Sequence, residues 1–229
     1  MKNLTKNTQR NNDDIANNYD RFTPEDYPIA YTARKWFFCG LPFYVDENVL
    51  VPRFDTEILV EIASSHAPRK DAPVLDLCTG SGCIAVALAK KGFKNITAAD
   101  ISKAALKVAR KNARVHKTEI RFVQSDLFAG VEGKFDIIVC NPPYIKTDEI
   151  GKYDASILHE PRIALDGGAD GLDFYRRIVK EAPLNKDGLL FLEVGDKEQA
   201  QEVKSLLQDA LFSDTIIIDN RVVYARKTD

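Results

Sequence analysis

The chain has few of the features that a secreted, membrane or metal-dependent protein requires. No apolar run among its 229 residues approaches the about 20 residues that span a membrane, and the first residues contain no apolar signal core. No two cysteines are spaced as Cys-x-x-Cys, so we expect reduced, buried thiols in a cytoplasmic protein. The histidines His66, His116 and His159 are scattered without metal-ligand spacing, and we expect no metal site.

The chain also lacks an excess of either charge. Its 32 Lys and Arg nearly balance its 34 Asp and Glu, for a net charge of −2, which gives no general attraction to nucleic acid or to an anionic membrane. A hydrophobic content of 45% is typical of a globular protein, and the length suffices for one α/β domain with a small appendage. No pattern indicates an assembly, so we expect a monomer.

What the sequence does contain is an alternation of short apolar strands and amphipathic helices. We expect strands at 74–78, 95–99, 120–124, 135–140 and 188–194, and then two more at 215–218 and 221–225. Asp219-Asn220 between the last two is a two-residue hairpin signal. The order predicts a doubly wound α/β fold whose mostly parallel, seven-stranded sheet ends in an antiparallel hairpin. Such an ending favours the Rossmann-like methyltransferase fold over the dehydrogenase fold.

A Gly-containing turn at 78–82 follows the first of these strands and opens into an Ala-rich and Leu-rich helix. Glycine lets the backbone approach a ligand, and the helix N-terminus presents free N–H groups. Asp100 ends the next strand, 24 residues after Asp76, where an acid can accept both ribose hydroxyls. Asp126 follows the third strand, where it could bind an adenine amino group or only cap a helix. The spacing favours S-adenosylmethionine over a nicotinamide cofactor, although the acids of a nucleotide-free domain could merely cap helices.

The tetrapeptide Asn141-Pro142-Pro143-Tyr144 follows the apolar run at 135–140. Asn141 offers a side-chain carbonyl and Pro142 a backbone carbonyl, and two acceptors can hold an NH2 group with its lone pair toward an electrophile. Pro143 stiffens the turn, and Tyr144 supplies a flat wall. We therefore predict methylation of a planar nitrogen, with Asn141, Pro142 and Tyr144 as the catalytic residues. The alternative is a rigid turn without function.

Before this domain the chain divides into two shorter regions. Residues 1–26 are polar and rich in Asn, which predicts a mobile tail with at most a short helix near 14–22. Residues 27–57 are rich in aromatic side chains and contain a predicted hairpin around a turn at 39–42. This hairpin could close the donor pocket, with Phe38 as a wall for the substrate, or it could only cover a sheet edge. Residues 58–229 form the expected methyltransferase domain.

With these motifs the chain resembles the N5-glutamine methyltransferases that modify peptide chain release factors, a family of class I S-adenosylmethionine-dependent enzymes. The resemblance covers about residues 27 to 226. Members usually carry an N-terminal helical domain that helps to dock the release factor, whereas only a short polar stretch precedes the hairpin here. Cys78 and Phe54 stand where the family commonly has Gly and Pro. The resemblance is carried by six segments: 28–30, 40–43, 51–57 (Val-Pro-Arg-Phe-Asp-Thr-Glu), 76–82, 141–144 and 160–172.

The resemblance implies S-adenosylmethionine as the cofactor and the Gly-Gly-Gln loop of a release factor as the protein substrate. It implies that Thr79 and Gly80 line the methionine end, that Asp100 binds the ribose and that Asp126 and the Leu127 backbone flank the adenine. The expected cofactor-binding residues are Asp76, Cys78, Thr79, Gly80, Gly82, Asp100, Asp126, Leu127 and Asn141. The expected substrate-binding residues are Asn141, Pro142, Pro143, Tyr144 and Phe38.

Other readings remain open. N6-adenine methylation of RNA or DNA would need a flipped base and a positive groove, which seven nearby acids (Asp148, Glu149, Asp154, Glu160, Asp166, Asp170 and Asp173) disfavour. We therefore expect no direct binding of nucleic acid. A glutamine of a ribosomal protein is another possible substrate, and a non-catalytic adenosine-binding module is a third class. A basic stripe from Lys103 to Lys117 is either a solvated helix face or a contact for ribosomal RNA or an acidic partner.

Overall fold

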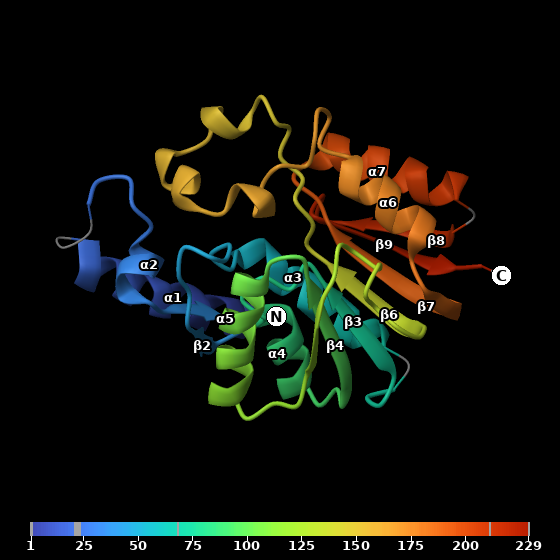
Figure 1. Ribbon diagram of the computed structural model, residues 1–229, viewed down its shortest axis with the longest axis horizontal. Coiled ribbons are helices and arrows are strands. Elements are labelled where there is room, and N and C mark those ends of the chain that lie inside the picture. The colour runs from blue at the N-terminus through green and yellow to red at the C-terminus, as the bar shows by residue number, and fades with distance from the viewer. Residues whose placement is uncertain (1, 21–23, 68, 211, 229) are drawn as a thin grey trace.

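A seven-stranded sheet forms the centre of the computed structural model, which describes residues 2–20, 24–67, 69–210 and 212–228 (Figure 1). Its strand order is β5-β4-β3-β6-β7-β9-β8. The first five of these strands are parallel, and β9 and β8 are antiparallel, which confirms the predicted sheet. The strands are β3 (Pro73–Leu77), β4 (Asn95–Asp100), β5 (Arg121–Gln124), β6 (Phe135–Cys140), β7 (Leu184–Glu193), β8 (Phe212–Ile218) and β9 (Val222–Lys227).

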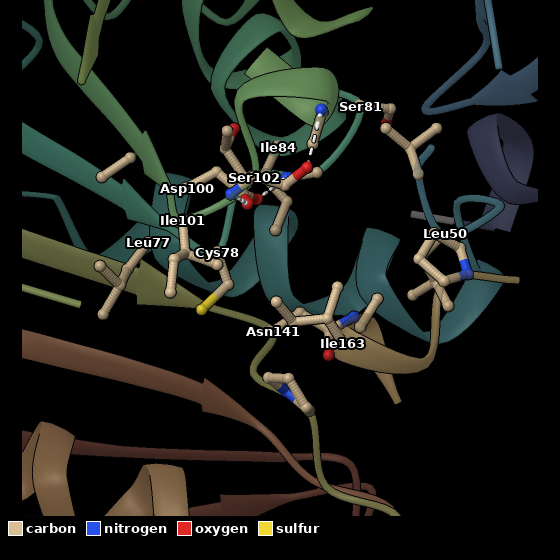
Figure 2. A pocket seen from close by; sticks show the side chains of 18 of the residues that line it. Leu50, Leu77, Cys78, Ser81, Ile84, Asp100, Ile101, Ser102, Asn141 and Ile163 are labelled. Carbon is tan, nitrogen blue, oxygen red and sulfur yellow. Dashed lines mark hydrogen bonds between the residues drawn. The ribbon is translucent and has the colours of Figure 1, made fainter. Parts of the chain in front are cut away.

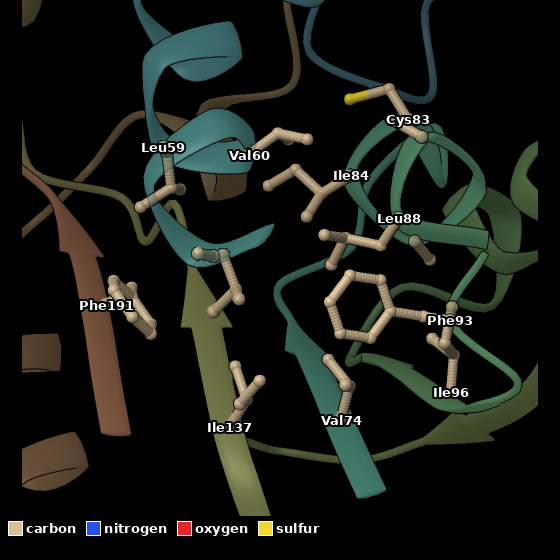
Figure 3. Close-up of a cluster of buried hydrophobic side chains, with 14 of the residues drawn as sticks. Leu59, Val60, Val74, Cys83, Ile84, Leu88, Phe93, Ile96, Ile137 and Phe191 are labelled. Atoms are coloured by element: carbon tan, nitrogen blue, oxygen red, sulfur yellow. The ribbon is translucent and has the colours of Figure 1, made fainter. Parts of the chain in front are cut away.

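Helices cover both faces of the sheet, because side chains alternate along each strand. Val74 and Ile137 point into one hydrophobic cluster, beneath the helices that precede β3 and follow it (Figure 3). Leu75 and Ile138, the next residues of the same strands, point into the cluster on the opposite face. The first face carries α3 (Phe54–His66), α4 (Cys83–Lys90) and α5 (Lys103–Val115), and the second carries α6 (Asp173–Glu181) and α7 (Lys197–Asp209).

The order of the strands places a crevice at the carboxyl end of β3. The chain runs from β3 to β4 and β5 on one side and then returns to β6 and β7 on the other. In open α/β sheets ligands bind where the direction of winding changes in this way. The ends of β3, β4 and β6, with the Gly-containing turn, Asp100 and Asn141, therefore meet at one edge of the sheet.

A small second sheet lies in the N-terminal region, as predicted. It pairs β1 (Trp36–Phe38) with β2 (Leu41–Phe43), after the short helix α2 (Ile29–Ala33). The turn is tighter than the expected 39–42: Cys39 and Gly40 alone form it, both with positive φ (49° and 74°). Pro42 consequently lies within the second strand rather than in the turn.

The first described residues form α1 (Lys2–Tyr19), so the expectation of at most a short helix is wrong for this stretch. Its polar side chains bind backbone groups of the hairpin, which the local sequence could not indicate. Asn12 accepts from Phe37 N (2.8 Å) and donates to Phe37 O (3.1 Å), and Thr8 Oγ1 accepts from Gly40 N (2.8 Å). The part of the expected helix at 21–22 lies outside the described residues.

A long excursion between β6 and α6 crosses the carboxyl edge of the sheet (Figure 1). It contains three 3-10 helices, at Ile150–Lys152, Ala155–His159 and Arg162–Ala164. A buried Glu160 fixes it to the segment before α3, because its carboxylate accepts from Val51 N (3.0 Å) and from the Arg53 guanidinium (2.6 Å). Among the described helices, none is long and apolar enough to cross a membrane.

Candidate active site

A cavity of about 250 Å³ opens at the predicted edge of the sheet, close to the lower bound of about 300 Å³ for ligand pockets. Its floor is the Gly-containing turn after β3, and its far wall includes Asn141 (Figure 2). Leu50 and Ile163, from the two segments that Glu160 joins, also line the cavity. The excursion and the segment before α3 therefore line the cavity, whereas the hairpin, which was predicted either to close the pocket or only to cover a sheet edge, contributes no lining residue.

Asp76 supports the Gly-containing turn after β3 from inside the protein rather than from the cavity. It is fully buried and does not line the cavity. Its Oδ2 accepts from Thr79 Oγ1 (2.5 Å) and from Ala85 N (3.0 Å), so one carboxylate joins the turn to the first turn of α4. Burial raises the pKa of Asp76 to about 7, against the lowering effect of these two hydrogen bonds. Asp76 was expected to contact the cofactor, but it does not face the cavity and instead positions the turn.

Cys78, Thr79 and Gly80 line the cavity directly, as a cofactor site would require. Gly80 has a φ of +51°, and a Cβ built on it would meet nothing within 4 Å. The turn thus presents open backbone to the cavity, and Gly80 N donates to Asp100 Oδ2 (2.9 Å). This cradle fits the methionine end of S-adenosylmethionine, where backbone groups bind a charged and compact moiety.

Gly82 does not line the cavity; it makes room for α5. A Cβ built there would meet Ala109 Cβ at 3.0 Å, and its φ is +80°. We expect Gly82→Ala to lower the free energy of unfolding by about 1–3 kcal/mol, through strain and overpacking, measured by urea denaturation. Gly92→Ala is the matched control, since Gly92 has a φ of +97° and no atom within 4 Å of a built Cβ. An equal loss in both variants would show that backbone strain alone is responsible.

Asp100 lies at the carboxyl end of β4, where its carboxylate faces the cavity (Figure 2). Besides Gly80 N, it accepts from Ser102 N at Oδ1 (2.8 Å). Burial raises its pKa, and these two backbone donors lower it. Each carboxylate oxygen has two lone pairs, so both can still accept from ribose hydroxyls.

Asp126 and Leu127 also line the cavity. Asp126 is 51% exposed and pairs with Arg177 of α6 (2.9 Å). Leu127 is buried with a φ of +46°. A carboxylate that is half exposed and already paired is a weaker anchor than Asp100.

Asn141 follows β6 and lines the cavity, and its Nδ2 donates to Thr56 Oγ1 (3.2 Å). This hydrogen bond occupies the amide nitrogen and leaves Oδ1 as an acceptor. Pro143 also lines the cavity, whereas Pro142 is buried and does not line it. Among the described residues, no hydrogen bond is made to the Pro142 carbonyl.

Tyr144 does not line this cavity but a second pocket, a groove of about 830 Å³. Gln199 fixes the Tyr144 backbone: its Nε2 donates to Tyr144 O (3.0 Å) and to Gly171 O (3.1 Å). Arg53 lines both the cavity and the groove, and the tetrapeptide contributes Asn141 and Pro143 to the cavity and Tyr144 to the groove. This arrangement suits two reactants, one in the cavity and one in the groove.

The prediction that Phe38 forms part of the substrate site is wrong. It is 1% exposed and packs edge-on against Phe43 in the core, with ring centroids 6.1 Å apart. It lines neither the cavity nor the groove. Hydrophobic burial under α3 and α4 accounts for this aromatic residue, which therefore cannot serve as a wall for the substrate.

The acids near the pocket mouth are less free than the sequence suggested. Glu160 is buried against Arg53, Asp166 pairs with Arg162 (3.1 Å), and Asp170 pairs with Arg176. The Tyr144 groove nevertheless stays acidic, because its charged lining comprises three basic and seven acidic side chains. These are Arg53, Lys146 and Arg221, and Asp55, Glu149, Asp170, Glu193, Asp196, Glu198 and Glu202.

The basic stripe on α5 points to solvent. The side chains of its members are all exposed, and the opposite face, with Leu106 and Val108, is buried; the members are Lys103, Lys107, Arg110, Lys111, Arg114 and, just after the helix, Lys117. Lys111 lies over the ring of Tyr44, with Nζ 3.0 Å from the centroid. A solvated helix face explains this pattern without a partner.

Sequence reasoning missed Thr56 and Gln199, whose side chains are hydrogen-bonded to Asn141 and to the Tyr144 carbonyl, and Glu193, which lies near Thr56. Thr56 lies in the first turn of α3, and Glu193 ends β7, beside β6. Thr56 and Glu193 are both buried, and the Thr56 side chain lowers the pKa of the Glu193 carboxyl. The signal for Glu193 was an acid at the end of an apolar strand, as at Asp100. Thr56 had no such signal, because its role depends on how α3 packs.

Comparison with known proteins identifies the family. Residues 53–170 match the family described as methyltransferase small domain. A release factor glutamine methyltransferase of Geobacter sulfurreducens is 43% identical over 192 residues, 82% of this chain and 67% of that protein. A ribosomal protein uL3 glutamine methyltransferase of Bradyrhizobium diazoefficiens is 42% identical over 187 residues, 73% of this chain and 57% of that protein. This chain belongs to the glutamine methyltransferase family.

Solved structures agree with this membership. A ribosomal protein L11 methylase from Lactobacillus delbrueckii subsp. bulgaricus superposes with a TM-score of 0.58 at 26% identity, covering 81% of this chain and 84% of that one. The two chains therefore share a fold. The resemblance stated from the sequence is therefore confirmed at the level of the family and the fold.

Proposed function

We propose that this chain transfers a methyl group from S-adenosylmethionine to the side-chain amide nitrogen (N5) of a glutamine, in the Gly-Gly-Gln loop of a peptide chain release factor. The observation that carries the proposal is the orientation of Asn141. Its Nδ2 is held by Thr56 at 3.2 Å, so Oδ1 is left to accept an N–H at the border between cavity and groove.

The chemistry requires orientation more than proton transfer. An amide nitrogen is nearly non-nucleophilic, because its lone pair is delocalised into the carbonyl. Hydrogen bonds from its two N–H groups to Asn141 Oδ1 and the Pro142 carbonyl favour the positive charge that develops on nitrogen. The proton can leave to solvent after the transfer, so no general base is assigned. Tyr144 packs against the plane of the amide.

The cavity is the proposed site of the donor, which supplies an electrophilic methyl carbon on a sulfonium. Gly80 offers open backbone to its methionine end, and Asp100 has free lone pairs for the ribose. Asp126 and Leu127 flank the adenine. Asp76 and Gly82 hold the shape of the turn without touching the ligand.

A glutamine of ribosomal protein uL3 is a second candidate substrate, because a relative at 42% identity is named for it. Both candidates belong to the translation machinery, which implies a cytoplasmic reaction. The acidic lining of the Tyr144 groove suits a protein segment and disfavours a phosphate backbone. N6-adenine methylation is thus the less supported alternative.

The decisive experiment offers labelled donor with purified release factor, purified uL3 or total RNA. We expect label in the release factor, and none after its loop glutamine is replaced by asparagine. Label in uL3 alone would move the proposal to the ribosomal substrate, and label in RNA would overturn it. Mass spectrometry of the labelled peptide locates the methyl group.

A further inference from the structure

Three side chains from different elements form a series behind the tetrapeptide. Asn141 Nδ2 donates to Thr56 Oγ1 (3.2 Å), and the Thr56 side chain lies near enough to the Glu193 carboxylate to lower its pKa. Thr56 is 2% exposed and Glu193 is 1% exposed, so water does not compete for these groups. One oxygen of Glu193, Oε2, has no partner among the described residues.

The series has a direction, because the Thr56 hydroxyl carries only one proton. An ionised carboxylate can only accept, so Glu193 takes that proton. The Thr56 oxygen must then accept from Asn141, which turns the amide nitrogen of Asn141 inward. The oxygen of the same amide is left for the substrate.

We propose that Glu193 and Thr56 are positioning residues that hold the Asn141 carboxamide with its oxygen toward the reacting NH2 group. The inference rests on the proposed function, because it assigns the reason for which Asn141 accepts rather than donates. With the series reversed, Thr56 donates to Asn141 Oδ1, and the Asn141 amide presents its own N–H groups to the substrate. Two NH2 groups then face each other, and the substrate nitrogen loses one acceptor.

Protonation of Glu193 is the event that permits the reversal, since a neutral carboxyl can donate to Thr56. Burial raises the pKa of Glu193 to about 7, and Thr56 and the cations Arg53 and Arg221 oppose this shift. The productive direction therefore dominates above about pH 7. The groups that face Glu193 from the surrounding elements are Arg53, Asp55, Cys83, Tyr144, Tyr175 and Arg221.

The first test removes the hydroxyl without changing the shape of the side chain. We expect Thr56→Val to lower kcat by about tenfold to hundredfold, with donor affinity within about twofold, because only the orientation of Asn141 is lost. Thr56→Ser restores the hydroxyl and should recover most of kcat. Thr97→Val, which removes a buried hydroxyl from β4, should leave kcat unchanged.

The second test compares the pH profile of kcat in the wild type and in Glu193→Gln. The wild-type kcat is expected to rise through about pH 7, and the variant, which cannot ionise, should lack this limb. Asp76 has a pKa raised to a similar value, but it is present in both proteins, so their difference reports Glu193. An amide donates as well as accepts, so the variant should keep an intermediate kcat.

A stability measurement supports the same assignment without any substrate. The pKa of folded Glu193 lies above its ordinary value of 4.5, so ionisation destabilises the fold increasingly from about pH 4.5 to about pH 7. The Tm of Glu193→Gln relative to the wild type should therefore be higher at pH 8 than at pH 5. A constant difference would show that Glu193 does not titrate in this range.

The outcomes separate this inference from the proposed function. A wild-type chain that transfers no methyl to any glutamine would overturn the function. An active wild type with an unchanged kcat in Thr56→Val, or with an identical pH limb in Glu193→Gln, would overturn the positioning role alone. A Thr56→Ser variant as slow as Thr56→Val would point to packing rather than to hydrogen bonding.

Discussion

Asn141→Ala should reduce kcat by roughly a hundredfold or more and leave the Kd for S-adenosylmethionine within a few-fold. The variant removes an acceptor that is strongest when positive charge develops on the substrate nitrogen, and one such group contributes about 10²- to 10³-fold. Single-turnover transfer to the release factor gives the rate, and calorimetric titration gives the donor affinity. The loss should appear in kcat and not in donor affinity, because Asn141 binds the substrate NH2 group, on which positive charge develops in the transition state.

The control for this prediction is the donor titration itself. Asn141 lines the same cavity as Gly80 and Asp100, so it is close enough to contact the donor. If the Kd for the donor rose by the same factor as kcat fell, Asn141 would be a donor-site residue instead. The melting temperature should change little, because Asn141 is only partly buried and the neighbouring Pro142 and Pro143 keep the turn rigid.

Asp100→Ala is expected to have the opposite effect: it should weaken donor binding and leave kcat nearly unchanged. Hydrogen bonds to a charged group contribute about 1.5–3 kcal/mol, so the Kd for the donor should rise by about tenfold to a hundredfold. At saturating donor, kcat should stay within a few-fold of the wild type. Equilibrium titration with S-adenosylmethionine and with its demethylated product measures the change.

Asp126→Ala is the matched comparison for Asp100→Ala. Asp126 lines the same cavity, but it is 51% exposed and paired with Arg177, so its loss should weaken donor binding only a few-fold. A larger effect at Asp126 than at Asp100 would reverse the assigned orientation of the nucleoside. Since Asp100 also accepts from Gly80 N and Ser102 N, the unfolding midpoint must be compared for both variants.

Local chemistry explains why the sheet and the main site could be predicted from the sequence. Alternating apolar strands leave few topologies, and strand ends with glycine or acids mark the edge where ligands bind. The cavity lined by Gly80, Asp100 and Asn141 agrees with that expectation. Asp219 and Asn220 likewise have positive φ (50° and 54°), as the hairpin signal required.

The failures have a common cause, which is tertiary contact between distant segments. Phe38 looked like an exposed aromatic wall, yet the helices α3 and α4 bury it. The polar helix α1 is held by backbone groups of the hairpin, 25 or more residues away. Glu160 joins two segments that line the cavity by reaching Val51, 109 residues earlier. None of these contacts produces a periodic pattern in the sequence from which it could be predicted.

The sequence by itself indicated the strands along the chain, the Gly-containing turn and the tetrapeptide 141–144 as candidate site segments, because each depends on residues close in the chain. Only the tertiary structure decided which way the Asn141 amide faces. A carboxamide has two similar ends, and its orientation depends on buried neighbours, here Thr56 and Glu193, that folding brings from α3 and β7. The direction of a hydrogen bond is a property of the assembled site, since it depends on which partner carries the proton.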